Sequence, residues 1–588
     1  MGYEKRLAVG AGENPKRYYG YVQSQTKIRT EVTRRLNFEG ESLTSDTEIA
    51  EGFCRYFASV YRRDTGSVVP LSVSVPHARM ADVQVTAQEV YSEIIRLDPS
   101  KAAGCDDVHP RILKATAEVV AIPLATLFNR SLSSGALPVD WREAIVSPIF
   151  KNGDRDRPGN YRPVSLTSVP CKVLERLLRQ RMCDYLVEHG LINPQQHGFL
   201  PRHSCLSNLL GFLDEVAERL DRGEPVEVLY FDFKKAFDSV NHRLLNAKLR
   251  AYGIAENVCW WISEFLRHRS YRVRVREASS EQTMACSGVP QGSVLGPLLF
   301  LVFINDVTRD VVNPCWLFAD DLKLVAGTAD RVGVQRDVDA LANWATSWDL
   351  PFNADKCRHL AVSSPETPFR VSGEQGTLHE IAHCSVVRDL GIQISADFKP
   401  ALQCAAAAAK ARRALFQLKA AVSCKEVEVF IPLYCSFVRP HLEYCLQAWA
   451  PFLRKDVFLL EKVQRLATRM VKGTKGMTYP ERLKFCDLFS LERRRLRGDL
   501  IEAFRIIRGS PDRPNCGLLS VCTVSTTRGH AFKLLKPRAR LDIRKYSFSH
   551  RVVGPWNRLP DRVVSACSMD SFKDMLDSVW SEVFPHLT

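Results

Sequence analysis

The chain has 588 residues and a mass of 66.4 kDa, more than one hydrophobic core supports, so we expect about three or four domains. Apolar residues make up 45% and charged residues 25%, which excludes a disordered chain, a fibre or a small disulfide scaffold. Residues 401–588 hold 33 Lys and Arg against 17 Asp and Glu, which accounts for the whole net charge of +15. This last third is expected to meet a polyanion, with a solvated basic surface as the alternative.

No segment predicts a membrane span or a secretion signal. The longest apolar stretch, 295–304, is interrupted by Gly296 and Pro297, and a span needs about 20 apolar residues. The first 20 residues lack the apolar core of a signal peptide. None of the 18 cysteines forms a C-x-x-C pair. We therefore expect an intracellular protein with reduced thiols, no membrane contact and no disulfide-linked partner.

Along the chain, residues 1–100 have the pattern of a polar, helical N-terminal extension, with a linker at 65–76. Helical and strand-like segments alternate from about residue 100 to about residue 400. Beyond that point, helices are predicted at 405–419, 452–471 and 479–508.

Two short segments carry paired or isolated carboxylates next to apolar, β-prone runs. Asp232 follows the run 226–231, which predicts a buried strand, and Asp238 lies six residues further on. Asp320 and Asp321 lie between the runs 315–319 and 322–326, which predicts a hairpin with the carboxylates at its tip. If the strand lies beside the hairpin, Asp232, Asp320 and Asp321 surround two Mg²⁺ ions, as in polymerases. Ordinary turn chemistry is the alternative for the Asp pair.

A glycine-rich segment, SGVPQGSVLG at 287–296, precedes the apolar run LLFLVFI. A loop of this kind that enters a helix lets backbone approach a substrate closely.

Together and in this order, these segments resemble the reverse transcriptases of non-LTR retrotransposons of the jockey and CR1 type. FDFKKAFD resembles the first catalytic motif, SGVPQGSVLGP the second and FADD the metal-binding hairpin, followed by FNADKC and RDLGI. Upstream, PIFKNGDRDRPGNYRPVSLTSVPCKVLE and NPQQHGFLPRHSC resemble the fingers.

The resemblance implies an α+β right-hand polymerase with fingers and palm at 101–400, a helical thumb at 401–510 and a basic C-terminal tail at 511–588. It implies an RNA-directed DNA polymerase that uses two Mg²⁺ ions, with Mn²⁺ as a substitute. Its partners would be template RNA, primer or target DNA and dNTPs. RNA assembly in the cytoplasm and integration in the nucleus follow from the same resemblance.

The resemblance also assigns site residues. The catalytic metal ligands would be Asp232, Asp320 and Asp321, assisted by the backbone carbonyl of Phe233. Phe237 would be the steric gate against ribonucleotides, because its ring would clash with a 2′-OH, with a core aromatic as the alternative. The remaining nucleotide contacts would come from Lys151, Arg162, Gln291, Gly292 and Lys356, with Lys356 near the leaving pyrophosphate. For the three cations, a solvated surface position is the alternative.

The chain departs from the family pattern at Leu200 and His203, where arginine is often found, which affects contacts of the fingers with template. Family members also carry an endonuclease ahead of the polymerase, so we expect either a fragment of an element protein or a gene model that starts late. A catalytically idle nucleic-acid-binding remnant is the alternative function, and a group II intron maturase is a weaker one. The intact set of catalytic motifs favours the enzyme.

For the basic C-terminal third, the clusters 492–495 and 536–540 are expected to meet phosphates. Trp556 and Phe548 either stack on bases or pack in a core.

Overall fold

The computed structural model describes residues 2–10, 15–26, 32–62, 64, 66, 79–362, 367–373, 376–508, 517–522 and 530–587. Helices and sheets are both present, as predicted for a polymerase fold. The expected linker at 65–76 lies outside the described residues, apart from Gly66. Within the described part of the chain, no helix combines the length and the apolar character needed to cross a membrane.

The first five-stranded sheet contains the predicted strand and hairpin side by side. Its order is β14-β11-β5-β10-β9, and β5 pairs antiparallel with both β10 and β11. The strands are β5 (Val226–Phe231), β9 (Cys315–Phe318), β10 (Asp321–Gly327), β11 (Arg358–Leu360) and β14 (Ala382–Cys384). The two-residue turn of the hairpin is Ala319-Asp320, so Asp321 is the first residue of β10. The prediction that both carboxylates lie at the tip is therefore wrong for Asp321.

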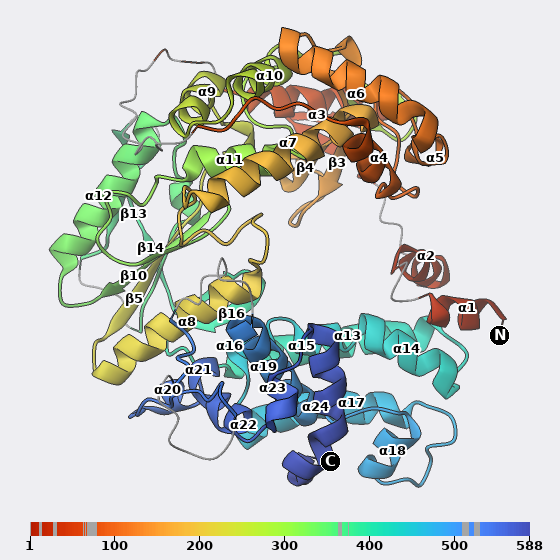
Figure 1. The fold of residues 1–588 in the computed structure, drawn as a ribbon, viewed down its shortest axis with the longest axis vertical. Coiled ribbons are helices and arrows are strands. Elements are labelled where there is room, and N and C mark those ends of the chain that lie inside the picture. The colour runs from red at the N-terminus through yellow and green to blue at the C-terminus, as the bar shows by residue number, and fades with distance from the viewer. Residues whose placement is uncertain are drawn as a thin grey trace.

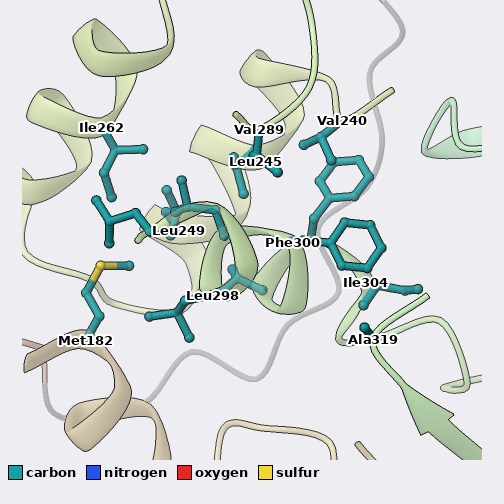
Figure 2. Packing of buried hydrophobic residues seen from close by; sticks show 14 of the residues in the cluster. Met182, Val240, Leu245, Leu249, Ile262, Val289, Leu298, Phe300, Ile304 and Ala319 are labelled. Atoms are coloured by element: carbon teal, nitrogen blue, oxygen red, sulfur yellow. The ribbon is translucent and has the colours of Figure 1, made fainter. Parts of the chain in front are cut away.

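Apolar helices cover one face of this sheet. Every residue of α11 (Gly296–Ile304) except Pro297 is buried, because the helix is apolar all round and packs inside the domain. Figure 2 shows Leu298, Phe300 and Ile304 of α11 among side chains of neighbouring helices, with Ile304 next to Ala319 of the hairpin turn. The other helices of this region are α7 (Val169–Glu188), α8 (Cys205–Arg222), α9 (His242–Ala251), α10 (Glu256–Leu266) and α12 (Arg331–Ser347).

The second sheet has the order β4-β3-β6-β7, with β8 also paired to β6. Its strands are β3 (Glu143–Phe150), β4 (Tyr161–Leu166), β6 (Arg269–Val275), β7 (Ala278–Ser279) and β8 (Thr283–Ala285). Helix α3 (Asp46–Ser59) packs on β6 through Phe53 and Phe57, and a short hairpin precedes α3. That hairpin, β1 (Leu36–Phe38) and β2 (Glu41–Leu43), interrupts the stretch expected to be helical. Next come α4 (Ala87–Ile95), α5 (Pro110–Ala115) and α6 (Ala117–Ser134).

Smaller strands connect the first sheet to the C-terminal helices. They are β12 (Arg370–Ser372), β13 (Leu378–Glu380), β15 (Val386–Asp389) and β16 (Ile392–Ser395), of which the last two form the hairpin at RDLGI.

The predicted C-terminal helices are present, with one break. Helices α13 (Ala401–Ala421) and α17 (Arg454–Arg469) match expectation, whereas 479–508 divides into α18 (Tyr479–Phe485) and α19 (Leu491–Arg508). Asp487 between them has a φ of 49°, a left-handed value that ends the helix. The connecting helices are α14 (Val427–Phe437), α15 (Pro440–Glu443) and α16 (Leu446–Trp449). Helices α1 (Gly2–Val9) and α2 (Pro15–Thr26) lie against α13 and α14 (Figure 1).

The C-terminal segment packs with α19 around one hydrophobic cluster. Trp556 is 0% exposed and Phe548 is 4% exposed, so both belong to this core, and the alternative of base stacking is wrong. Its helices are α20 (Asp542–Lys545), α21 (Phe548–Arg551), α22 (Val553–Asn557), α23 (Asp561–Val564) and α24 (Met569–Val583).

Two arginines of the basic cluster 492–495 contact other groups of the protein. Arg494 pairs with Glu443, and the guanidinium of Arg493 lies over the ring of Phe489, 3.5 Å from its centroid. In the cluster 536–540, the Arg540 side chain donates to the backbone carbonyl of Asp221 at 3.1 Å. Protein partners thus take up part of both clusters, whereas Lys536 and Arg538 remain exposed, so phosphate contact by the two clusters stays a prediction.

Candidate active site

The strand register brings the three predicted carboxylates to one edge of the first sheet. Phe231 pairs with Leu322, so Asp232, the residue after β5, lies across from Asp321, the first residue of β10. Asp320 precedes Asp321 in the turn. Residues far apart in sequence thus meet because an antiparallel pair ends here.

The electrostatics of the carboxylates reflect this proximity. Partial burial and the charge of Asp232 raise the pKa of Asp320, although Arg162 and Lys151 oppose the shift. Desolvation by the surrounding protein and the charges of Asp320, Asp389 and Asp232 raise the pKa of Asp321 to about 7. Carboxylates that repel one another in this way gain from a bound cation.

A second strand-like pairing fixes Asp232 from the other side. The backbone N–H of Asn353 donates to the Asp232 carbonyl at 2.7 Å, and that of Lys234 donates to the Pro351 carbonyl at 2.9 Å. Neither bond uses the carbonyl of Phe233, which lies between them. Lys356, from the same FNADKC segment, places Nζ 3.0 Å from Oδ2 of Asp232.

The glycine-rich loop packs closely against β4 and the turn after β5. Gly292 has a φ of 119°, and a Cβ there would lie 2.4 Å from the carbonyl oxygen of Ser165. The side-chain amide of Gln291 donates to Oδ1 of Asp238 at 2.8 Å. Burial raises the pKa of Asp238, whereas this hydrogen bond lowers it. The loop is therefore held in one shape beside Asp238.

Phe237 has the mixed exposure expected of a residue that faces a substrate. Its ring stacks on Phe300 with centroids 4.5 Å apart and meets Phe199 edge-on at 6.0 Å. The side chain is half-buried, so Phe300 supports the ring from beneath while part of it remains accessible.

Cationic side chains gather beside the carboxylates. Lys151 follows β3 and Arg162 lies in β4, in register with Ile149. Partial burial and the charges of Lys235 and Arg162 lower the pKa of Lys151 to about 8. Cations that repel one another in this way are suited to a polyphosphate.

Sequence reasoning missed several residues that shape this site. Lys235 is one of the cations beside Lys151, and its position three residues after Asp232 was the available signal. Glu175 is fully buried and accepts from the backbone N–H groups of Val294 and Leu295, just before α11. Gln196 bonds the hairpin turn. No local pattern marks Glu175 or Gln196, because their partners lie more than 100 residues away.

The described residues contain no group of three His, Cys, Asp or Glu side chains close enough together to hold an ion. The chemistry of the donors nevertheless fits Mg²⁺, which prefers carboxylate and carbonyl oxygens.

Comparison with known proteins agrees with this geometry. Residues 149–394 match the family model described as reverse transcriptase (RNA-dependent DNA polymerase), so the chain contains a reverse transcriptase domain. The predicted resemblance to non-LTR retrotransposon polymerases is confirmed by its relatives.

One similar protein is the probable RNA-directed DNA polymerase from transposon BS of Drosophila melanogaster, 30% identical over 52% of this chain and 35% of the relative. Another, from the X-element of the same fly, is 24% identical over 80% of this chain and 54% of the relative. The polymerase from its mobile element jockey is 29% identical over 50% of this chain and 33% of the relative. The chain thus spans between a third and just over half of these relatives.

Proposed function

We propose that this chain is an RNA-directed DNA polymerase of a non-LTR retrotransposon, which copies element RNA into DNA. The observation that carries the proposal is the register of β5 and β10, which gathers Asp232, Asp320 and Asp321 at one sheet edge beside Lys151 and Arg162. The names of the relatives support the same activity.

In this proposal the first sheet is the palm and the second sheet belongs to the fingers. Helices α13–α19 form the thumb, and the C-terminal helices form a tail that packs against α19. Supporting evidence is that the first sheet, and the second sheet apart from most of β3, lie within the matched residues 149–394, and that the chain after them is helical.

Asp232 and Asp320 would hold two Mg²⁺ or Mn²⁺ ions, with Asp321 and the Phe233 carbonyl assisting. When bound, these ions would activate the primer 3′-OH and stabilise the charge on the leaving group. The 3′-oxygen attacks the α-phosphate of a dNTP, the bond between the α-phosphate and the bridging oxygen breaks, and pyrophosphate leaves. The chain's carboxylates orient this site, and Lys356 neutralises Asp232 when no ion is present.

The remaining side chains would select and position the nucleotide. Lys151 and Arg162 bind the triphosphate, and Lys356 can turn from Asp232 to donate a proton to the leaving pyrophosphate. Gln291 and Gly292 line the pocket, where Gln291 is fixed by Asp238. Phe237, supported by Phe300, excludes a 2′-OH.

The test is primer extension on a poly(rA) template with an oligo(dT) primer, dTTP and Mg²⁺. The proposal expects DNA synthesis by the unaltered chain and none by Asp320→Asn, which keeps size and removes the charge. A folded chain that binds the template and primer but adds no nucleotide would instead be the idle remnant.

A further inference from the structure

A short segment preceding α8 extends the first sheet beside the catalytic hairpin. The backbone N–H of Leu317 in β9 donates to the Gln195 carbonyl at 3.0 Å, and the N–H of His197 donates to the Leu317 carbonyl at 2.9 Å. Residues 195–198 therefore run parallel to β9 along its free edge and end beside the turn Ala319-Asp320.

The side chain of Gln196 bonds directly to this turn. It is 3% exposed. Its Oε1 accepts from the backbone N–H of Ala319 at 2.8 Å and from that of Gly198 at 2.7 Å, and its Nε2 donates to the Ala319 carbonyl at 3.4 Å. One buried amide thus satisfies both backbone polar groups of Ala319.

Ala319 is a position where such support matters. Its φ of 57° lies in the left-handed region, which is unfavourable for alanine because of its Cβ. Asp320 follows immediately, so the conformation of Ala319 sets the direction in which the carboxylate leaves the turn.

We propose that Gln196 is a positioning residue that fixes the Ala319-Asp320 turn and so aims the carboxylate of Asp320 at the metal site shared with Asp232. The inference rests on the proposed function. Gln196 acts through the Ala319 backbone, in the way that outer groups orient metal ligands elsewhere.

A substitution at Gly198 would disturb the same contact in a second way. A Cβ at Gly198 would lie 2.3 Å from the backbone nitrogen of Ala319. Gly198→Ala must therefore push the segment and the turn apart, and its Cβ would also lie 3.0 Å from Oε1 of Gln196, while the residue at position 196 is still glutamine.

The experiment compares Gln196→Met, which keeps length and loses the hydrogen bonds, with Gly198→Ala and with the control Gln464→Met. Gln464 is also fully buried and makes three hydrogen bonds, to Tyr434, Tyr479 and Phe489, but it lies in α17. Three quantities are measured on the full chain: hydrogen exchange of peptides covering 315–322, Mn²⁺ binding by electron paramagnetic resonance, and kcat and KM for dTTP.

We expect both turn variants to exchange faster over 315–322, to bind Mn²⁺ more weakly and to lose kcat, by about 10–100-fold for the last two, with KM for dTTP little changed. Gln464→Met should change none of the three quantities measured at the turn. Unaltered exchange and Mn²⁺ affinity in Gln196→Met would overturn the inference, as would an equal loss in Gln464→Met. If the unaltered chain lacks polymerase activity, the proposed function fails, whereas exchange and Mn²⁺ binding still decide the role of Gln196.

Discussion

Lys356 places its ammonium nitrogen 3.0 Å from a carboxylate oxygen of Asp232. The lysine side chain is 64% exposed and that of Asp232 is 31% exposed, so the pair is accessible and weak. We propose that a bound cation displaces Lys356 from Asp232 at little cost, and that the released lysine reaches the leaving pyrophosphate.

Lys356→Met is accordingly expected to separate metal binding from catalysis. Mn²⁺ affinity should rise or stay equal, because a competing cation is lost, while kcat should fall by about 100-fold if Lys356 is the proton donor. Titration of Mn²⁺ binding and single-turnover extension measure the two effects. A parallel loss of Mn²⁺ affinity would contradict the displacement model.

Asp320→Asn should reduce nucleotide addition by about 1000-fold or more, because losing a metal ligand removes stabilisation of the transition state. The fold should survive, because burial and the charge of Asp232 already raise the pKa of the Asp320 carboxyl. Removing the Asp320 charge therefore relieves repulsion among the carboxylates. Primer extension and thermal unfolding are the paired measurements. Asp389→Asn is a comparison variant that removes a neighbouring carboxylate, since Asp389 also raises the pKa of Asp321 but pairs with Lys323. Near-normal extension by Asp320→Asn would remove this residue from the metal site.

Phe237→Ala should raise the ratio of rNTP to dNTP incorporation by roughly 10–100-fold, because the ring that would meet the 2′-OH is gone. The structure provides a control in Phe199, whose ring touches Phe237 edge-on and is 44% exposed. Phe199→Ala removes that contact without removing the gate. An unchanged incorporation ratio in an active Phe237→Ala protein would assign the ring to packing on Phe300.

Lys151 predicts a pH dependence of nucleotide binding. Its pKa of about 8 means that the free site loses this positive charge as pH rises through that value, and with it the attraction for the triphosphate. KM for dTTP should therefore rise several-fold between pH 8 and about pH 9. Lys151→Arg keeps its charge at these pH values and should flatten the profile. The same rise in Lys151→Arg would locate the titrating group elsewhere.

The same low pKa has a consequence for stability. Lys151 is protonated more readily in the unfolded chain, whose usual lysine pKa is higher. The unfolded state therefore binds more protons between pH 8 and about 10, and this group's contribution to folding stability increases with pH across that window.

The sequence predicted site residues that lie at strand ends, but it did not predict those whose role depends on contacts with distant segments. Asp232 and the hairpin were predictable because apolar β-prone runs flank them. Gln196 was not, because its role depends on a turn 123 residues away. Asp321 was assigned to the tip, although a two-residue turn with Ala319 at positive φ leaves it inside β10.

The basic C-terminal third shows the limit of charge counting. A net charge does not show which arginines form ion pairs. The burial of Trp556 depends on packing with α19, which the sequence pattern does not show. Arg551 binds Asp499, and Arg544 binds Asp214 of α8, so part of the excess charge joins the segment to the domain. Deletion of 510–588 would also open the cluster shared with α19, so it destabilises the fold and gives no clean measure of nucleic-acid binding.

The exposed cations of α13 provide a sharper test of where nucleic acid is held. Lys410 and Arg413 are exposed on this helix, and each phosphate contact on a single strand contributes a slope of about −0.7 to the salt dependence. We expect Lys410→Gln with Arg413→Gln to weaken RNA binding and to flatten the slope by about 1.4. Fluorescence anisotropy with single-stranded RNA between about 50 and 200 mM salt measures both.

Arg497 of α19 is the matched control for this test, since it pairs with Asp577 of α24 at 2.7 Å. Arg497→Gln removes the same charge but leaves Asp577 unpaired, so it should lower thermal stability and leave the salt slope unchanged. If Arg497→Gln flattened the slope as much as a single substitution on α13, RNA would contact α19 as well. If the double variant bound RNA with unaltered affinity and slope, the charges of α13 would be only a solvated surface.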